Sequence, residues 1–374
     1  LEAGLDPNRG LEQALIDSGR NKGVAQMLLA AGASTSPASS FDTPLHHAVA
    51  WGTEADLDML LEAGTDPNPS LRPNSYMPLH YAAFSGRSYA VKRLLEYGAD
   101  PAPRDEFGMT PLHWAAWRGD AKSCVLLLAA GAPADGPNEY DKLTPLFHAA
   151  NLGGAPALAA LLESASPNLR ALLHRANDDE ETPWDIAAQG RVRNAIGYVM
   201  NGAKFGLSRE NLGLPRPGEK VDLEAWQRAL DDRAECVRLL LAAGADPTRL
   251  LPENNTIFHS LFDARLGRYY FPMFDSYNGV RHKNPDIFYD LGLQVMPLAY
   301  PQSLRGLLRA GVPLPDLKEG RTWEDYCRQA ASSSPFINMG ARSTADEDWA
   351  VQKEHAAACT AVLKEESARR AALP

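Results

Sequence analysis

The sequence predicts an all-α solenoid of stacked helix-turn-helix units, and three observations support this fold class. A Thr-Pro-Leu-His tetrapeptide or a one-letter variant recurs, and its leucines are 34, 33 and 34 residues apart at Leu45, Leu79, Leu112 and Leu146. A glycine follows each of these tetrapeptides within nine residues. A second apolar run then closes three of the four copies at a glycine. Repetition at this period indicates one small unit stacked on copies of itself.

Each unit is expected to begin with a short helix at the tetrapeptide. The hydroxyl of Thr43 or Thr110 can accept a hydrogen bond from an amide at the helix start, and proline at the first helical position loses no hydrogen bond. Small residues follow in each copy, as at Ala115 and Ala116. They allow the neighbouring helix pair to approach closely. Gly119 then ends this first helix.

The second half of each unit is predicted to be an amphipathic helix. The runs at 90–95 and 124–128 contain adjacent leucines, which would form an apolar layer. Each run is followed by a Gly-Ala turn, at Gly98 and at Gly131. One unit alone cannot bury such a layer. We therefore expect successive units to stack and to shelter the leucines between them.

The repeating unit resembles the ankyrin repeat. That family's pattern is a turn, then Gly-x-Thr-Pro-Leu-His-x-Ala-Ala, a break at glycine, and Val-x-x-Leu-Leu-x-x-Gly-Ala-Asp; residues 105–132 carry nearly all of it. The resemblance is strong over 41–165 and looser elsewhere. A looser copy opens at 181–188 and is expected to end at Gly202. The resemblance implies a solenoid of about eight or nine units.

The resemblance also suggests how the chain is divided. We expect residues 1–253 to form the ankyrin-like solenoid, 254–311 a degenerate repeat with an aromatic-rich insertion near the C-terminal end, and 312–374 a further degenerate repeat with a C-terminal cap. The chain starts on the tail of a repeat and without methionine. We interpret it as a fragment of a longer protein.

The insertion at 254–304 separates two halves of one degenerate copy. Its motif histidine, His259, stands 48 residues before Leu307, whereas His46 and Leu60 of a regular copy are 14 apart. Eight aromatic residues between positions 269 and 300 favour an ordered element over a disordered loop. The insertion either covers the end of the solenoid or forms a second recognition element.

Charge and cysteine content exclude several classes of partner and compartment. The chain has 37 basic and 47 acidic residues and a formal charge of −10, with no basic stripe, so no nucleic-acid partner is expected. No apolar stretch reaches the roughly 18 residues that a membrane span needs. The four cysteines are widely spaced and form no Cys-x-x-Cys pair, which fits a reducing compartment. We expect an intracellular protein of the cytoplasm or the nucleus.

The resemblance implies that a protein partner, of unknown identity, binds at the concave face and the turn tips. First-helix ends and turn tips are expected to be exposed to solvent. Here they hold mainly aromatic residues and one arginine, which is the composition of interface hot spots. The predicted partner-binding residues are Trp51, Tyr76, Phe84, Phe107, Met109, Trp117, Arg118 and Tyr140. The alternative for the large rings is that they only pack against neighbouring turns.

Residues with catalytic or ligand chemistry do not form a recognisable motif. The resemblance implies that His46, His80 and His113 hydrogen-bond neighbouring turns and the capping threonine. No Gly-x-Ser-x-Gly sequence or phosphate-binding glycine loop occurs. The expected protein is therefore a non-catalytic scaffold without catalytic residues, cofactor or metal. Two alternatives stay open: an enzyme whose active site is built from the 254–304 insertion, and an adaptor module of a longer multidomain protein.

Overall fold

The structure is a computed structural model. Among the described residues, helices are the only regular secondary structure, and turns and loops connect them. It describes residues 27, 43–69, 76–139, 142–152, 154–164, 168–177, 180–189, 234–247, 249, 301, 304–309, 311–312, 314, 322–332 and 345–372. The chain divides into two compact units, residues 1–149 with 156–172 and residues 150–155 with 173–374. The prediction of an all-helical chain of paired helices is thus confirmed for the described residues.

The cluster of aromatic side chains that the structure describes does not lie in the insertion that was predicted to be rich in aromatic residues. Residues 254–300 of the predicted insertion lie outside the described residues. The aromatic cluster that the structure does describe is formed within residues 76–117, in the first unit. The described aromatic cluster therefore belongs to the regular repeats and not to the C-terminal end.

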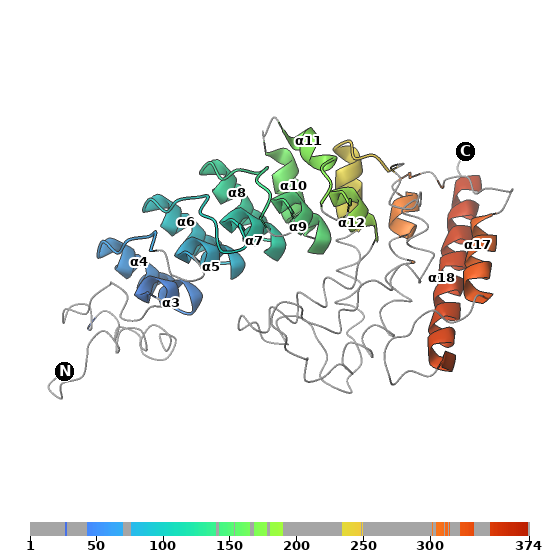
Figure 1. Ribbon diagram of the computed structural model, residues 1–374, viewed down its shortest axis with the longest axis horizontal. Coiled ribbons are helices and arrows are strands. Elements are labelled where there is room, and N and C mark those ends of the chain that lie inside the picture. The colour runs from blue at the N-terminus through green and yellow to red at the C-terminus, as the bar shows by residue number, and fades with distance from the viewer. Residues whose placement is uncertain are drawn as a thin grey trace. The chain divides into compact units, whose positions relative to one another are not determined.

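The first unit is a stack of helix pairs (Figure 1). Between residues 44 and 173 the described helices are, in chain order, α3 (Pro44–Ala50), α4 (Glu54–Glu62), α5 (Pro78–Phe84), α6 (Ser88–Glu96), α7 (Pro111–Arg118), α8 (Ala121–Ala129), α9 (Pro145–Leu152), α10 (Ala155–Glu163) and α11 (Leu169–Leu173). Helix α5 packs on α3 and α7, and α6 packs on α4 and α8. Two rows result: a first-helix row of α3, α5 and α7, and a second-helix row of α4, α6 and α8.

The first helices begin where the tetrapeptide predicts. The amide of Thr43 donates to Nδ1 of His46 at 3.3 Å, and the amide of His46 lies 3.4 Å from the Thr43 hydroxyl oxygen. The amide of Thr110 donates to Nδ1 of His113 at 3.1 Å in the same way. These reciprocal bonds satisfy backbone groups that the helix start leaves open.

The same histidines connect one repeat to the next. Because Nδ1 accepts a backbone hydrogen bond, the proton belongs on Nε2, which then donates to a carbonyl. Nε2 lies 3.1 Å from the Tyr76 carbonyl for His46, 3.2 Å from the Met109 carbonyl for His80, and 3.3 Å from the Leu143 carbonyl for His113. The predicted structural role of these three histidines is confirmed.

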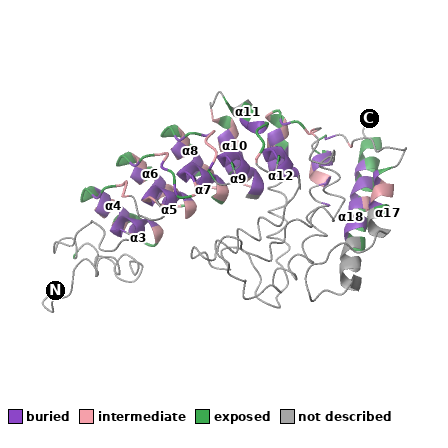
Figure 2. Ribbon diagram, in the orientation of Figure 1, coloured by how far each residue is buried: buried purple, intermediate pink, exposed green. Residues whose placement is uncertain are grey.

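The apolar layer lies between the helices, as the period predicts. Leu45, Leu79 and Leu112 are fully buried or nearly so, together with the alanine pairs that follow them. Figure 2 shows buried residues along α5 and α7 and exposed residues at the ends of α4, α6 and α8. Gly119 adopts the left-handed conformation at the end of α7, with φ of 75°, which explains the glycine at that break.

In the second unit, a carboxylate replaces the motif histidine. Helix α12 (Pro183–Gln189) begins after Thr182, whose amide and hydroxyl both donate to Oδ2 of Asp185, at 2.8 and 2.7 Å. Arg249 donates to the same oxygen at 2.7 Å. Asp185 is buried, so its charge requires these donors. An arginine thus takes the place of the carbonyl that the histidines contact.

The position of that arginine after a glycine matches that of the contacted carbonyl in a regular copy. Arg249 stands five residues after Gly244, just as Pro103 stands five residues after Gly98 in a regular copy. There the motif histidine contacts the Pro103 carbonyl at 3.2 Å. Arg249 thus supplies to the copy that opens at 181 the contact that position 103 supplies in a regular copy. The predicted end of that copy, Gly202, lies outside the described residues.

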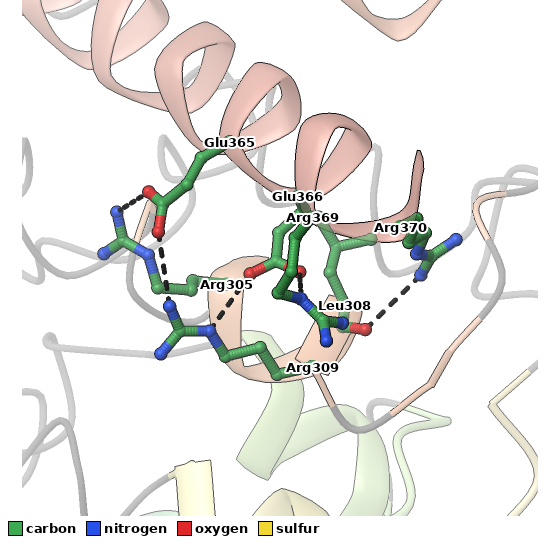
Figure 3. A network of polar contacts seen from close by, with 7 residues as sticks. All are labelled: Arg305, Leu308, Arg309, Glu365, Glu366, Arg369 and Arg370. Carbon is green, nitrogen blue, oxygen red and sulfur yellow. Dashed lines mark hydrogen bonds and ion pairs between the residues drawn. The ribbon is translucent and has the colours of Figure 1, made fainter. Parts of the chain in front are cut away.

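The end of the chain is a long helix that packs within the second unit. Helix α18 (Ala345–Ala371) packs on α17 (Trp323–Ser332) and, through charged groups, on helical residues 304–309 (Figure 3). Buried Glu366 accepts from Arg309 at 3.0 Å and from Arg369 at 2.6 Å. Burial alone would raise the pKa of Glu366, but these two hydrogen bonds hold that pKa below its ordinary value. The last helix is thereby anchored to residues 304–309; whether it caps a degenerate repeat stays a prediction.

Candidate partner-binding surface

Five aromatic side chains gather on the first-helix row. We call them the aromatic patch: Tyr76, Tyr81, Phe84, Trp114 and Trp117. All five are half-buried. They come from α5, from α7 and from the residues directly before α5. The patch is thus shared by two successive repeats.

Helix geometry and repeat stacking together bring these rings into contact. Tyr81 and Phe84 are three residues apart on α5, as Trp114 and Trp117 are on α7, so each pair occupies one side of its helix. Because α5 packs on α7, the two pairs meet. The Phe84 ring lies 5.3 Å from that of Trp114, edge to face, and 5.4 Å from that of Trp117, nearly parallel. Both separations are those of favourable aromatic pairs.

Tyr76 extends the patch toward the turn tips. Its ring lies 6.1 Å from that of Trp114 and 5.9 Å from that of Tyr81. Burial, followed by the nearby charges of Asp105 and Glu106, raises the pKa of Tyr76, so the phenol keeps its proton. The hydroxyl end of this ring is therefore close to the carboxylates of the next turn.

Asp105 organises the turn at this end of the patch. Its carboxylate accepts from the amides of Phe107 and Met109, at 2.9 and 2.8 Å, and from the indole nitrogen of Trp114 at 2.9 Å. Burial raises the pKa of Asp105, these three hydrogen bonds oppose that shift, and the charge of Glu106 adds to it. The carboxylate thus fixes both the turn and the orientation of the Trp114 ring.

Arg118 stands at the opposite end of the patch. It is the last residue of α7, it is exposed, and its side chain passes Gly86 at the end of the preceding first helix. Its Nε lies 3.5 Å from where a β-carbon on Gly86 would be. No ion pair joins Arg118 to an acidic side chain within the described parts of the chain. A positive charge is thus available at the end of α7, next to Trp117 in sequence and close to Gly86.

The eight predicted partner-binding residues are not all on this surface. Tyr76, Phe84 and Trp117 belong to the aromatic patch, and Arg118 borders it. Trp51, at the end of α3, is 57 % exposed, and its ring stacks on His47 at 5.5 Å. Tyr140 lies outside the described residues. Whether any of them binds a partner stays a prediction.

The two residues at the turn tip differ from each other. Phe107 is half-buried, and its carbonyl accepts from the amide of Glu139 in the next turn, at 3.1 Å. Met109 is 6 % exposed, and its sulfur lies 3.2 Å from Nδ2 of Asn138. The expectation that Met109 is exposed is therefore wrong. The turn folds back on Asp105 and directs this side chain into the stack.

Two members of the patch, Tyr81 and Trp114, were missed among the predicted residues. Both occupy the position directly after the motif histidine, whereas on the first helices the prediction used only the positions after the alanine pair. The signal was present in the sequence, since each stands three residues before a predicted ring. Helical spacing alone would have placed them on the same side as Phe84 and Trp117.

The comparison with known families identifies this part of the chain. A family model described as ankyrin repeats in many copies matches residues 79–129. Residues 79–129 are ankyrin repeats. They hold four of the five rings of the aromatic patch. Ankyrin repeats generally mediate protein–protein interaction. No curated protein matches the chain.

The described residues contain neither a metal-binding cluster nor a membrane-spanning helix. Within those ranges, no three His, Cys, Asp or Glu side chains come close enough to hold a metal ion together. None of the described helices combines the length and the apolar character that crossing a membrane would require. The aromatic patch is the feature of these residues that best fits a functional role.

Proposed function

We propose that the ankyrin repeats of this chain form a non-catalytic scaffold that binds a protein partner through the aromatic patch. One observation carries the proposal: five half-buried rings meet on the first-helix row of two successive repeats. Aromatic residues are enriched among interface hot spots, which commonly contribute about 2 kcal/mol or more each on truncation. Their π faces and apolar edges would form the centre of the contact.

Rigid presentation would supply the mechanism. The histidine–carbonyl bonds hold successive repeats in register, and the hydrogen bonds of Asp105 hold the turn and the Trp114 ring. The rings are therefore ordered before a partner arrives. A surface that needs no ordering on binding avoids part of the entropic cost of association.

Affinity capture with quantitative mass spectrometry tests the proposal. The double variant Phe84→Ala/Trp117→Ala removes two adjacent rings, and we expect it to reduce capture of the specific partner more than tenfold. The matched control is Tyr97→Ala/Val125→Ala, which removes two exposed apolar side chains, 38 % and 54 % exposed, from the second-helix side. We expect the control to leave capture unchanged.

The folded state of each variant is checked by circular dichroism and thermal unfolding. If the aromatic double variant stays folded and captures the same partner as strongly as the original chain, the proposed binding surface is wrong. Loss of capture in the control variant alone would move the interface to the second-helix side.

A further inference from the structure

We infer that the aromatic patch accepts an extended peptide segment carrying a basic side chain at one end and an acidic side chain about four residues away. The inference rests on the proposed function and adds the chemistry of the partner. It follows from opposite charges at the two ends of the patch and from the distance between those ends.

The turn-tip end of the patch is acidic. The Asp105 carboxylate accepts from the indole nitrogen of Trp114 in the patch at 2.9 Å, and the next residue, Glu106, is exposed. Arg104, on the same turn, donates instead to the carbonyls of Gly108 and Pro137, at 2.9 and 3.0 Å. A partner's lysine or arginine at this end would relieve the repulsion between neighbouring carboxylates. It would also face the rings of Tyr76 and Trp114, which favour a cation.

The other end of the patch is basic. Arg118 has no ion-pair partner in the described ranges. It directly follows Trp117 in α7, and its side chain passes Gly86, two residues after Phe84. The nearest acidic residue in sequence, Asp120, is engaged at the start of α8 by the amide of Ser123 at 3.2 Å. A partner's carboxylate at this end could form a charged hydrogen bond with the guanidinium group.

The separation of the two ends sets the length of the segment. From Thr110 beside the acidic turn to Arg118, α7 advances eight residues, or about 12 Å at 1.5 Å per residue. An extended peptide advances about 3.3 Å per residue and covers this distance in about four residues. The residues between the two charges would lie over the rings, so we expect them to be apolar.

Three synthetic pentapeptides with blocked ends test the inference. Each has three central leucines, and the end residues are lysine and glutamate, two lysines, or two glutamates. Binding to the full chain is followed by NMR through the indole N–H signals of Trp114 and Trp117, assigned with tryptophan-to-phenylalanine variants. We expect the lysine–glutamate peptide to bind about threefold more tightly than either like-charged peptide, since an exposed ion pair contributes at most about 1 kcal/mol. Salt at about 1 M should abolish the preference.

Charge reversal on the protein provides the sharper comparison. In Arg118→Glu we expect the two-lysine peptide to become the tightest ligand, and in Glu106→Lys the two-glutamate peptide. Both side chains are exposed, so both variants should fold. Equal affinity for all three peptides, an unchanged order in the two variants, or no binding at about 1 mM peptide would overturn the inference. Peptides that bind equally but are lost in Phe84→Ala/Trp117→Ala would overturn the charge pattern while leaving the proposed function standing.

Discussion

Replacing Leu112 with alanine is expected to lower the free energy of unfolding by about 3 kcal/mol. Leu112 is completely buried in α7. This helix packs on α5 of the preceding repeat and on α8 of its own repeat. The substitution removes apolar area and leaves a cavity that three helices cannot all move to fill. Because each repeat is stabilised mainly by its neighbours, the loss should extend beyond α7.

Urea unfolding followed by circular dichroism measures this effect. The matched control is Val125→Ala, a substitution on the exposed side of α8, where the valine is 54 % exposed. We expect the control to change the free energy of unfolding by less than about 0.5 kcal/mol. Equal losses in the two variants would contradict the assigned core of the stack.

Acidification from pH 7 to pH 5 is expected to lower the free energy of unfolding by about 6 kcal/mol through the buried imidazoles of His46, His80 and His148, and further through that of His113. Burial lowers the pKa of His46, His80 and His148 to about 4 in each case, and that of His113 well below its ordinary value. Protonation would also break a hydrogen bond at His46, His80 and His113. Nδ1 of His80, for example, accepts from the Met77 amide, and a proton on Nδ1 would displace that amide.

The direction of this pH dependence follows from proton binding. An unfolded chain has imidazole pKa values near 6.5 and so binds more protons than the folded chain between about pH 6.5 and pH 4. Stability is therefore complete above that window and falls as the pH falls through it, by about 2 kcal/mol per imidazole at pH 5. Urea unfolding at pH 7, 6 and 5 measures the change. Equal free energies at pH 7 and pH 5 would show that these imidazoles are not buried.

Much of the first unit could be predicted from local signals. Helix starts after Thr43 and Thr110 follow from capping chemistry, which depends on a few adjacent residues. The buried leucines follow from the period, because every copy places them on the same side of a helix. The histidine bonds between repeats followed from the family resemblance and were borne out atom by atom.

What could not be predicted depends on contacts distant in the sequence or on the path of a turn. Met109 is buried because the turn closes on Asp105, and nothing in the residue type distinguishes a methionine pointing inward from one pointing outward. The Asp185–Arg249 ion pair joins residues 64 apart, so the repeat period could not locate it. The aromatic patch was predicted only in part. On each first helix the prediction considered the ring after the alanine pair and not the ring directly after the motif histidine.

Site-specific photo-crosslinking tests most directly whether the aromatic patch binds a partner. A photoreactive phenylalanine analogue is placed at position 84, in the patch, or at position 125, on the exposed side of α8, and crosslinked products are compared for the same captured protein. We predict that position 84 crosslinks to the partner and that position 125 does not. Crosslinking from position 125 alone would contradict the proposed interface.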